Sequence, residues 1–413
     1  MSSDTRGGAP LTPTRGTGHI LVEGEKMSKQ MGNFILLDEA VRGHREMVIN
    51  DKVKTIGWCA DATRVALAEG GDGLDDANFS CDVADSAILR LSSELKFAED
   101  VLASAGDAPD AGVGAGAGAD VGAGAGAGAG DAAAAERFFR ELFVAQMDQA
   151  IEDADAAYAA MRYRDALAAG FYGLMDARDA YRKACGLVGA TPRKAALQRY
   201  LHLLVVLVSP ICPHFCDHVW RNVLRLPGSV LTASWPAPTS ASRADRERAL
   251  QRGTYVLSLE TRVRQSIERA AATKKVARPS HAECLVGRGV PAWYQFVMDL
   301  LKRAAPDPRA AGAGAPASGD LMKLVSAELR ARPEFQSATK DAMKLAVQVY
   351  AEALKQGPAA YETTVPFDEV GTLNELAAYR RAAVPVDAFS ARFVEASDGG
   401  AYATPGKPAV SVS

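Results

Sequence analysis

Through the middle of the chain, hydrophobic residues recur every third or fourth position, which is the period of an amphipathic helix. Phe139, Phe143, Met147 and Ile151 are four residues apart, with charged and amide residues between them. The same period predicts further helices at residues 163–186, 193–208, 214–224 and 240–275. Because short connections join these segments, we expect antiparallel neighbours in a helical bundle.

The last third of the chain has a different pattern. Short apolar runs typical of strands alternate with helical periodicity. Strands are predicted at residues 282–287 and 384–394, and helices between them at 292–301, 321–329 and 339–354. Residues 304–319 are rich in Ala, Gly and Pro and are expected to form a loop. The predicted fold class is therefore mainly α, with a helical bundle followed by a small α+β domain.

Residues 104–135 are almost entirely Gly and Ala with a few Asp, which predicts a disordered insert. The glycines from Gly112 to Gly130 all stand at even-numbered positions, so the phosphate-binding pattern G-x-G-x-x-G does not occur there. The segment also has no lysine to reach a phosphate. A phosphate-loop interpretation of this segment is therefore disfavoured.

The composition is that of a soluble globular protein, with 48% hydrophobic and 23% charged residues in 413. A formal charge of −3 means that affinity for nucleic acid must come from local basic surface. The most apolar run, Leu201–Val208, is far too short to span a bilayer. The six cysteines lack the spacing of a disulfide framework, so reduced thiols in the cytoplasm are expected. We expect neither a membrane nor DNA as a partner.

Candidate chemistry is concentrated near the start of the chain, in the run Lys26-Met27-Ser28-Lys29. Two lysines and a hydroxyl on a mobile loop can close over a nucleoside triphosphate and neutralise charge on its phosphates. Gly32 allows the chain to turn away sharply after the loop. The alternative is an ordinary solvated lysine loop, since a tetrapeptide can arise by chance.

Residues 26–34 resemble the KMSKS loop of class I aminoacyl-tRNA synthetases. Further segments follow in the order found in the leucyl enzymes of cytosolic and archaeal type. These segments are Gly18–Ile20, Ala60–Ala68, Asp75–Phe79, Ile88–Leu91, Ser209–Cys216 with Trp220, and Ser234–Pro236. Three more resemble landmarks of the eukaryotic leucyl C-terminal extension, namely Pro279–His281, Pro366–Glu369 and Pro405–Pro408. The KMSK and Pro-His-Phe elements are shared with isoleucyl and valyl enzymes, which remain an alternative.

The resemblance implies three domains. Residues 1–75 would be the KMSKS-loop end of a Rossmann-type catalytic domain. Residues 76–238 would form a bundle similar to the anticodon-binding domain, carrying the 104–135 insert. Residues 239–413 would form an α+β domain that contacts tRNA.

The resemblance also implies leucine–tRNA ligase activity in the cytoplasm, in which leucine and ATP form leucyl-adenylate before leucine passes to tRNA(Leu). Lys29 would bind the ATP triphosphate, Lys26 would assist, and Ser28 would help to set the loop. Together with Met27, these residues are expected to contact the ATP phosphates. ATP accompanied by Mg²⁺ is the implied cofactor, with no metal bound by this chain. A multi-synthetase assembly is a further candidate partner.

Two departures from the family pattern affect this interpretation. Gln30 stands where the family has a second serine, and residues 44–57 look like extra sequence that could displace the helix supporting the loop. The HIGH element is also absent, because no two of the six histidines are three positions apart. The chain is therefore expected to be a C-terminal portion that is inactive alone. The alternative is a non-catalytic tRNA-binding or scaffold fragment.

Cys212, His214, Cys216 and His218 have spacing that suggests a zinc site. Because the cysteines and histidines would lie on different faces of one helix, packing is the preferred interpretation. Tyr158, Tyr163, Phe171 and Tyr181 are likewise interpreted as core. Basic residues that could face RNA are Arg178, Arg182, Lys183, Arg193, Lys194, Arg199, Arg262, Arg264, Lys274, Lys275 and Arg278.

Overall fold

The computed structural model describes residues 18–30, 32–49, 52–72, 75–104, 127–240, 242–272, 280–311, 314–384, 386–395 and 403–412. Its residues group into two compact units. Unit 1 contains the described residues of Met1–Gly122, Phe139–Lys183 and Thr191–Arg246. Unit 2 contains those of Ala123–Phe138, Ala184–Ala190 and Glu247–Ser413. Helices predominate in both, which confirms the predicted fold class. The three-domain division stays a prediction.

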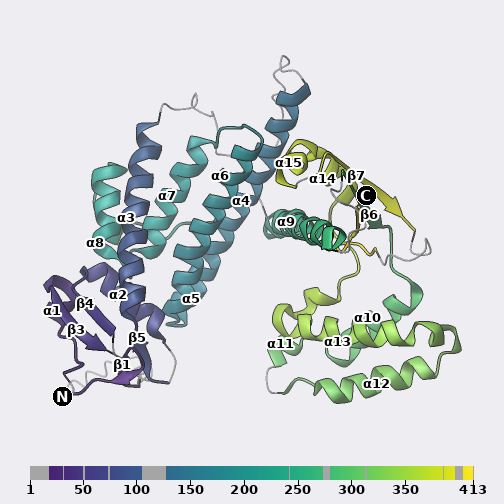
Figure 1. Cartoon of the computed structure of the whole chain (residues 1–413), viewed down its shortest axis with the longest axis horizontal. Coiled ribbons are helices and arrows are strands. Elements are labelled where there is room, and N and C mark those ends of the chain that lie inside the picture. Colours follow the sequence, from purple (N-terminus) through teal and green to yellow (C-terminus); the bar gives the residue numbers. More distant parts are fainter. Residues whose placement is uncertain are drawn as a thin grey trace, which may run out of the picture. The chain divides into compact units, whose positions relative to one another are not determined.

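Two small sheets and two short helices form the N-terminal part of unit 1. In one sheet the order is β2-β1-β5, with β1 and β5 parallel. The other is the antiparallel hairpin of β3 and β4. Figure 1 shows these elements beside the lower end of α3. Their bounds are β1 Ile20–Val22, β2 Glu25–Lys26, α1 Leu37–Arg42, β3 Arg45–Ile49, β4 Lys52–Ile56, α2 Ala60–Gly70 and β5 Ala77–Phe79.

Long helices lie side by side in the rest of unit 1 (Figure 1). The predicted helices at 163–186, 193–208 and 214–224 are confirmed, although the first and last each contain a π-helical segment. In the first, Gly170 lies so close to α7 that an added Cβ would be 3.2 Å from Cβ of Leu207. The bounds are α3 Cys81–Ala103, α4 Ala127–Ala159, α5 Tyr163–Leu167, η1 Ala168–Gly173, α6 Leu174–Leu187, α7 Lys194–Val208, α8 Pro213–His218, η2 Val219–Val223 and η3 Val230–Thr232. The first part of α4, to residue 138, and the end of α6, from residue 184, belong to unit 2.

The bundle core confirms most of the predicted aromatic core. Phe171 and Tyr181 are fully buried, and Tyr181 stacks on Phe143 at a ring distance of 5.2 Å. The hydroxyl of Tyr158 donates to the carbonyl of Leu207 at 2.8 Å. The prediction that Tyr163 belongs to the core is wrong, because this residue is 43% exposed at the start of α5.

The Gly/Ala insert ends earlier than the sequence predicts, because α4 includes its last residues. Residues 105–126 lie outside the described residues, but α4 begins at Ala127 instead of after residue 135. Residues 132–135 are consecutive alanines, and alanine has the highest intrinsic helix propensity. The end of the insert therefore joins the amphipathic helix that follows it.

Unit 2 contains the predicted mixture of strands and helices. The sheet order is β7-β6-β8, with β6 and β7 parallel and β6 and β8 antiparallel. The second predicted strand is shorter than expected, because it begins at Ala388. The elements are α9 Arg243–Ala272, β6 His281–Gly287, α14 Glu369–Glu375, α15 Ala377–Ala383, β7 Ala388–Val394 and β8 Ala409–Val412.

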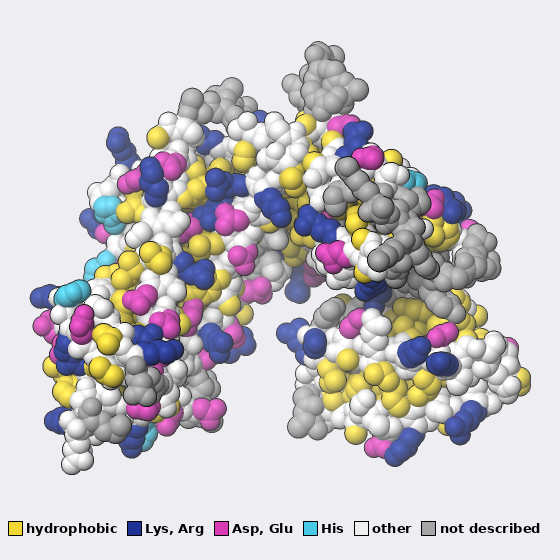
Figure 2. All heavy atoms as spheres, in the orientation of Figure 1, with side chains coloured by type: hydrophobic (Ala, Val, Ile, Leu, Met, Phe, Trp, Pro, Cys, Tyr) yellow, Lys and Arg dark blue, Asp and Glu magenta, His cyan; other side chains and the backbone are white. Residues whose placement is uncertain are grey.

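Between β6 and α14 the chain forms a helical group with its own core. Val297, Leu301, Val325 and Val349 are all fully buried within it. Figure 2 shows hydrophobic side chains gathered on the visible face of this group. In the described part of the segment 304–319, which is predicted as a loop, residues 308–311 are helical and a further helix begins at Ser318. The elements are α10 Ala292–Ala304, α11 Pro308–Ala311, α12 Ser318–Arg330, η5 Pro333–Ala338, α13 Thr339–Gln356 and η6 Gly357–Tyr361.

Across the parts of the chain that the structure describes, no helix combines the length and apolarity needed to cross a membrane.

Candidate functional site

The candidate site begins with a tight hairpin between β1 and β2. Val22 pairs with Glu25, so Glu23 and Gly24 form the whole turn. Both have positive φ, 51° and 83°, as a two-residue turn between right-twisted strands requires. Lys26, the first lysine of the predicted site, ends β2 and is exposed. The hairpin therefore sets where the loop begins.

Asn33 closes the loop that carries both lysines, which we call the signature loop (residues 26–33). Its side-chain oxygen accepts from the N–H of Ser28 at 2.7 Å, and its amide nitrogen donates to the carbonyl of Lys26 at 3.1 Å. Asn33 is 4% exposed, so these bonds are shielded from water. Its role was not predicted from the sequence, although Gly32-Asn33-Phe34 was part of the resemblance.

Two further bonds complete the signature loop. The hydroxyl of Ser28 accepts from the N–H of Gln30 at 3.2 Å, and the N–H of Gly32 donates to the carbonyl of Ser28 at 3.0 Å. Gly32 has φ of 70°, which explains a glycine at this position. The side chain of Lys29 is exposed, as is that of Lys26. The described residues of the loop thus have a hydrogen-bonded backbone and present two ammonium groups to solvent.

Acidic and amide residues before and within β5 hold the hairpin from the other side. The side-chain oxygen of Asn78 accepts from the N–H of Gly24 at 2.6 Å. Asp76 accepts from the N–H of His19 at 2.7 Å. Both belong to the Asp75–Phe79 segment, which the resemblance singled out without a role. Asn78 thus fixes the turn that precedes Lys26, and Asp76 fixes the residue before β1.

The extra segment 44–57 is a hairpin whose two ends meet. Gly43 and Gly57 approach so closely that an added Cβ on Gly57 would overlap the carbonyl of Gly43. The N–H of Trp58 donates to the carbonyl of Ala40 at 2.7 Å, so the chain returns to α1 after the extra segment. Arg45 reaches back to the carbonyl of Phe34 at 2.8 Å. The two ends of the extra segment therefore meet, and its Arg45 braces the residue that follows the signature loop.

Two more segments from the resemblance bind each other within unit 1. The carboxylate of Asp61 in α2 lies 3.0 Å from Nδ1 of His214 and accepts from the N–H of Phe215 at 2.6 Å. Arg64 donates to the carbonyls of Pro210 and Ile211 at 2.9 and 2.7 Å. These contacts fix α2 against the start of α8.

The same contacts explain the cysteine and histidine cluster. Cys212 and Cys216 are fully buried, and burial raises the pKa of both thiols well above the usual range. His214 faces Asp61, whereas His218 bonds Asn222 in the next turn. Within the described ranges, no group of three or more His, Cys, Asp or Glu residues could hold a metal ion. The arrangement is that of packing and helix capping.

Several basic residues predicted to face RNA are instead structural. Arg178 is 6% exposed and bonds Glu94, at 2.6 Å to Oε2. Arg199 bonds the buried Asp148. Lys194 donates to the carbonyls of Leu102 and Ser104 at 3.2 and 2.6 Å.

In unit 2, Arg262 and Arg264 donate to the carbonyls of Pro408 and Ala383 at 3.2 and 2.7 Å. Lys274, Lys275 and Arg278 lie outside the described residues. Arg182 remains a surface candidate in unit 1, with a side chain that is 49% exposed. On the visible face of unit 1, Lys and Arg side chains are interspersed with Asp and Glu (Figure 2). Contact with RNA would therefore depend on local sets of cations.

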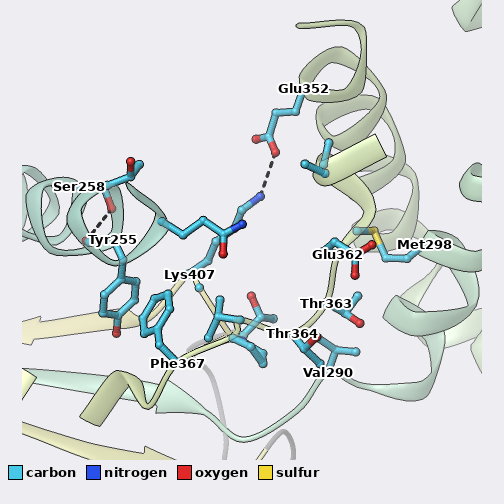
Figure 3. Close-up of a pocket in the computed structure, with 18 of the residues that line it drawn as sticks. Tyr255, Ser258, Val290, Met298, Glu352, Glu362, Thr363, Thr364, Phe367 and Lys407 are labelled. Atoms are coloured by element: carbon cyan, nitrogen blue, oxygen red, sulfur yellow. Dashed lines mark hydrogen bonds and ion pairs between the residues drawn. The ribbon is translucent and has the colours of Figure 1, made fainter. Parts of the chain in front are cut away.

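A pocket of about 410 Å³ lies within unit 2 (Figure 3). Tyr255 and Phe367 form one apolar wall, and Met298 lies on the opposite side. Lys407 reaches toward Glu352, with Nζ 3.0 Å from Oε2. Glu362 on the rim pairs with Lys302 at 3.4 Å. These charged groups neutralise one another, so the pocket offers no unbalanced charge that would call for an ionic ligand.

Comparisons with known proteins show what the sequence of this chain is similar to. Residues 141–284 match the family described as the anticodon-binding domain of tRNA ligase. The cytoplasmic leucine–tRNA ligase of Pongo abelii is 27% identical over 94% of this chain and 29% of its own length. The Neurospora crassa enzyme of the same name is 30% identical over 87% of this chain and 28% of its length. That of Arabidopsis thaliana is 37% identical over 54% of this chain. The chain thus spans less than a third of the length of these relatives.

Proposed function

We propose that this chain serves as the C-terminal portion of a leucine–tRNA ligase. The proposal starts from the premise that the chain belongs to the leucyl branch of the class I aminoacyl-tRNA synthetases. In that role its bundle and unit 2 would bind tRNA(Leu), and its signature loop would contact ATP. The relatives are named cytoplasmic, and we propose the same compartment for this chain. The three domains expected at 1–75, 76–238 and 239–413 are part of this proposal.

The signature loop carries the proposal. Asn33 fixes its backbone at Lys26 and Ser28, while the ammonium groups of Lys26 and Lys29 face solvent. A hydrogen-bonded backbone with exposed cations suits the binding of a polyanion, because the backbone at Lys26 and Ser28 is already held when the phosphates arrive. Lys29 would bind the triphosphate and Lys26 would assist. Mg²⁺ would arrive bound to the ATP phosphates.

A substitution in the complete enzyme tests the assignment of the lysines. We expect Lys29→Ala to lower leucine-dependent pyrophosphate exchange by roughly 100-fold, the scale of losing one preorganised charge contact. Lys52→Ala is the matched control, because Lys52 is exposed on the neighbouring hairpin and should leave the rate unchanged. Unchanged exchange in the Lys29 variant would refute the assignment.

The isolated chain provides a second test. No two histidines have the HIGH spacing, so we expect no leucine-dependent pyrophosphate exchange from this polypeptide alone. Its affinity for tRNA(Leu) should fall by about 100-fold or more between about 50 and 200 mM salt, because phosphate contacts release counterions. Filter binding across that range measures the slope. Exchange activity of the chain alone would refute the fragment assignment.

A second candidate is a non-catalytic tRNA-binding or scaffold module. Within these 413 residues, no two histidines have the HIGH spacing, so these residues by themselves would bind tRNA without activating leucine. Salt-dependent tRNA binding without any partner half that restores activity would support this role. Copurification with other synthetases would support membership of a multi-synthetase assembly.

A further inference from the structure

Glu23 adopts a backbone conformation that glycine would adopt more easily. Its φ of 51° lies in the left-handed region, where a Cβ approaches the following carbonyl. Non-glycine residues in this region are uncommon, and such strain concentrates at functional positions. A turn former alone would be better served by glycine or asparagine. The glutamate side chain must therefore contribute something that glycine cannot.

The side chain of Glu23 caps the first helix of the bundle. Its Oε1 accepts from the N–H of Cys81 at 2.8 Å, across 58 residues of sequence. Cys81 is the first residue of α3, and the preceding Ser80 makes no side-chain capping bond. A carboxylate at a helix N-terminus satisfies a free N–H and interacts favourably with the helix dipole. Burial and the neighbouring Glu23 together raise the pKa of Cys81 to about 12.

The backbone of Glu23 connects this cap to the signature loop. Its N–H donates to the carbonyl of Phe79 at 3.0 Å, and Gly24 bonds Asn78. Two residues later the chain reaches Lys26, whose carbonyl is bound by Asn33. A series of hydrogen bonds thus links α3 to the signature loop through the turn formed by Glu23 and Gly24.

We propose that Glu23 is a positioning residue that couples the first turn of α3 to the signature loop, so that the bundle and the two lysines move together. This rests on the proposed function, in which the bundle binds tRNA and the loop binds phosphates. Glu23 itself contacts neither ligand. Its carboxylate transmits the position of a bundle helix to the backbone that carries Lys26 and Lys29.

Hydrogen exchange of the full chain, measured by mass spectrometry, tests the proposal on peptides covering 24–34 and 80–88. Glu23→Gly relieves the backbone strain and removes the cap. We expect exchange in both peptides to accelerate by about tenfold, the effect of losing one charge-assisted hydrogen bond. Glu23→Gln keeps a side-chain acceptor and should stay within about threefold of the parent. Glu25→Gln is the matched control on the next strand and should change neither peptide.

Cys81→Pro removes the donor from the other side of the same bond. Proline is well tolerated at the first position of a helix, and Ser80 already has the extended backbone that a following proline requires. Circular dichroism verifies that each variant keeps its helices. We expect Cys81→Pro to accelerate exchange in residues 24–34 as Glu23→Gly does. If Glu23 only forms the turn, Glu23→Gly will exchange as slowly as the parent and Cys81→Pro will leave the loop unchanged, which would overturn the proposal.

Addition of saturating tRNA(Leu) tests the coupling itself. Bound RNA should slow exchange of residues 24–34 in the parent chain but not in Glu23→Gly or Cys81→Pro. Equal slowing in all three chains would overturn the coupling. If tRNA does not bind at any salt concentration, the proposed function fails, while the exchange of the free variants still decides the role of Glu23.

Discussion

Two buried arginines, one in each unit, differ in their hydrogen-bond partners and therefore in the direction in which their pKa values shift. Arg178 in α6 and Arg380 in α15 are both 6% exposed. Arg178 bonds Glu94, Asp179 and the hydroxyl of Tyr200. Arg380 lies 4.1 Å from the ring centre of Phe389, but its Nε and Nη1 have no hydrogen-bond partner in the described part of the chain.

The pKa values follow from this difference. Burial alone would lower the pKa of either guanidinium, because it disfavours the charged form. For Arg178 the acidic partners and Tyr200 outweigh burial, and its pKa is raised. For Arg380 burial prevails and the pKa falls to about 10. Burial of an arginine therefore indicates stabilisation only where its donors are satisfied.

The largest expected effect comes from breaking the satisfied arginine. Arg178→Met leaves the carboxylate of Glu94, itself 1% exposed, without its cation. We expect unit 1 to lose about 3–5 kcal/mol of unfolding free energy, the cost of an uncompensated buried charge. Urea titration followed by hydrogen exchange of α3 and α6 peptides measures this loss.

Two further variants sharpen that prediction. Arg162→Met removes one half of an exposed pair with Asp165 and should cost less than about 0.5 kcal/mol. The double variant Glu94→Gln with Arg178→Met should regain part of the loss, because it leaves no buried charge at that position. A single Arg178→Met variant as stable as the Arg162 control would contradict the assigned role of the pair.

A buried carboxylate offers an intermediate effect with a pH signature. Asp148 in α4 is fully buried and accepts from the N–H groups of Thr239 and Ser240, at 3.1 and 2.7 Å to Oδ2. Burial would raise the pKa of Asp148, but bonds from Ser240, Thr239 and Arg199 reverse this, and its pKa is lowered from 3.8. Asp148→Asn replaces an acceptor with a donor that faces other donors. We expect a loss of about 2 kcal/mol at neutral pH.

The sign of the pH dependence follows from the lowered pKa. A carboxyl group with a depressed folded-state pKa contributes its stability above the unfolded value and loses it as pH falls through the folded value. The difference in stability between the parent chain and Asp148→Asn should therefore be constant above about pH 4 and shrink below it. Urea unfolding at several pH values tests this. A difference that grows on acidification would contradict the lowered pKa.

The smallest expected effect has the opposite sign. Arg380→Met replaces an unsatisfied buried cation with an apolar side chain that can also pack on Phe389. We expect unit 2 to gain about 1–2 kcal/mol, because the desolvation cost of the charge disappears. Hydrogen exchange of β6 and β7 peptides reports this gain. Arg392→Met, which removes an exposed pair with Glu283, should be nearly neutral, and a strongly destabilised Arg380 variant would show that its donors are satisfied after all.

The comparison also marks the limit of prediction from sequence. Helical periodicity correctly located the helices at 163–186 and 193–208, because amphipathic spacing is a local property of the chain. The same periodicity could not separate Arg178 from Arg182, which lie one turn apart in α6. The sequence predicts Arg178 as a candidate RNA contact, yet the side chain is buried against Glu94, 84 residues earlier in the chain.

The candidate site divides in the same way. The residue types at Lys26, Ser28 and Lys29 indicated a phosphate-binding loop, and the structure places both lysines on an exposed, hydrogen-bonded loop. Their assignment to ATP stays a prediction. The sequence did not reveal that Glu23 caps α3 or that Asn78 holds Gly24. Those bonds join residues more than 50 positions apart, and no local pattern specifies them.

By itself the sequence determined where helices form, which segments resemble a leucyl synthetase, and which loop carries cations, because periodicity and motif spacing are encoded over a few residues. Tertiary structure alone decided which charges are buried and which buried charges have partners. It also brought the turn before the lysines onto the end of a bundle helix. The reason is that desolvation and hydrogen bonding depend on what surrounds a group in space, and distant parts of the chain supply those surroundings.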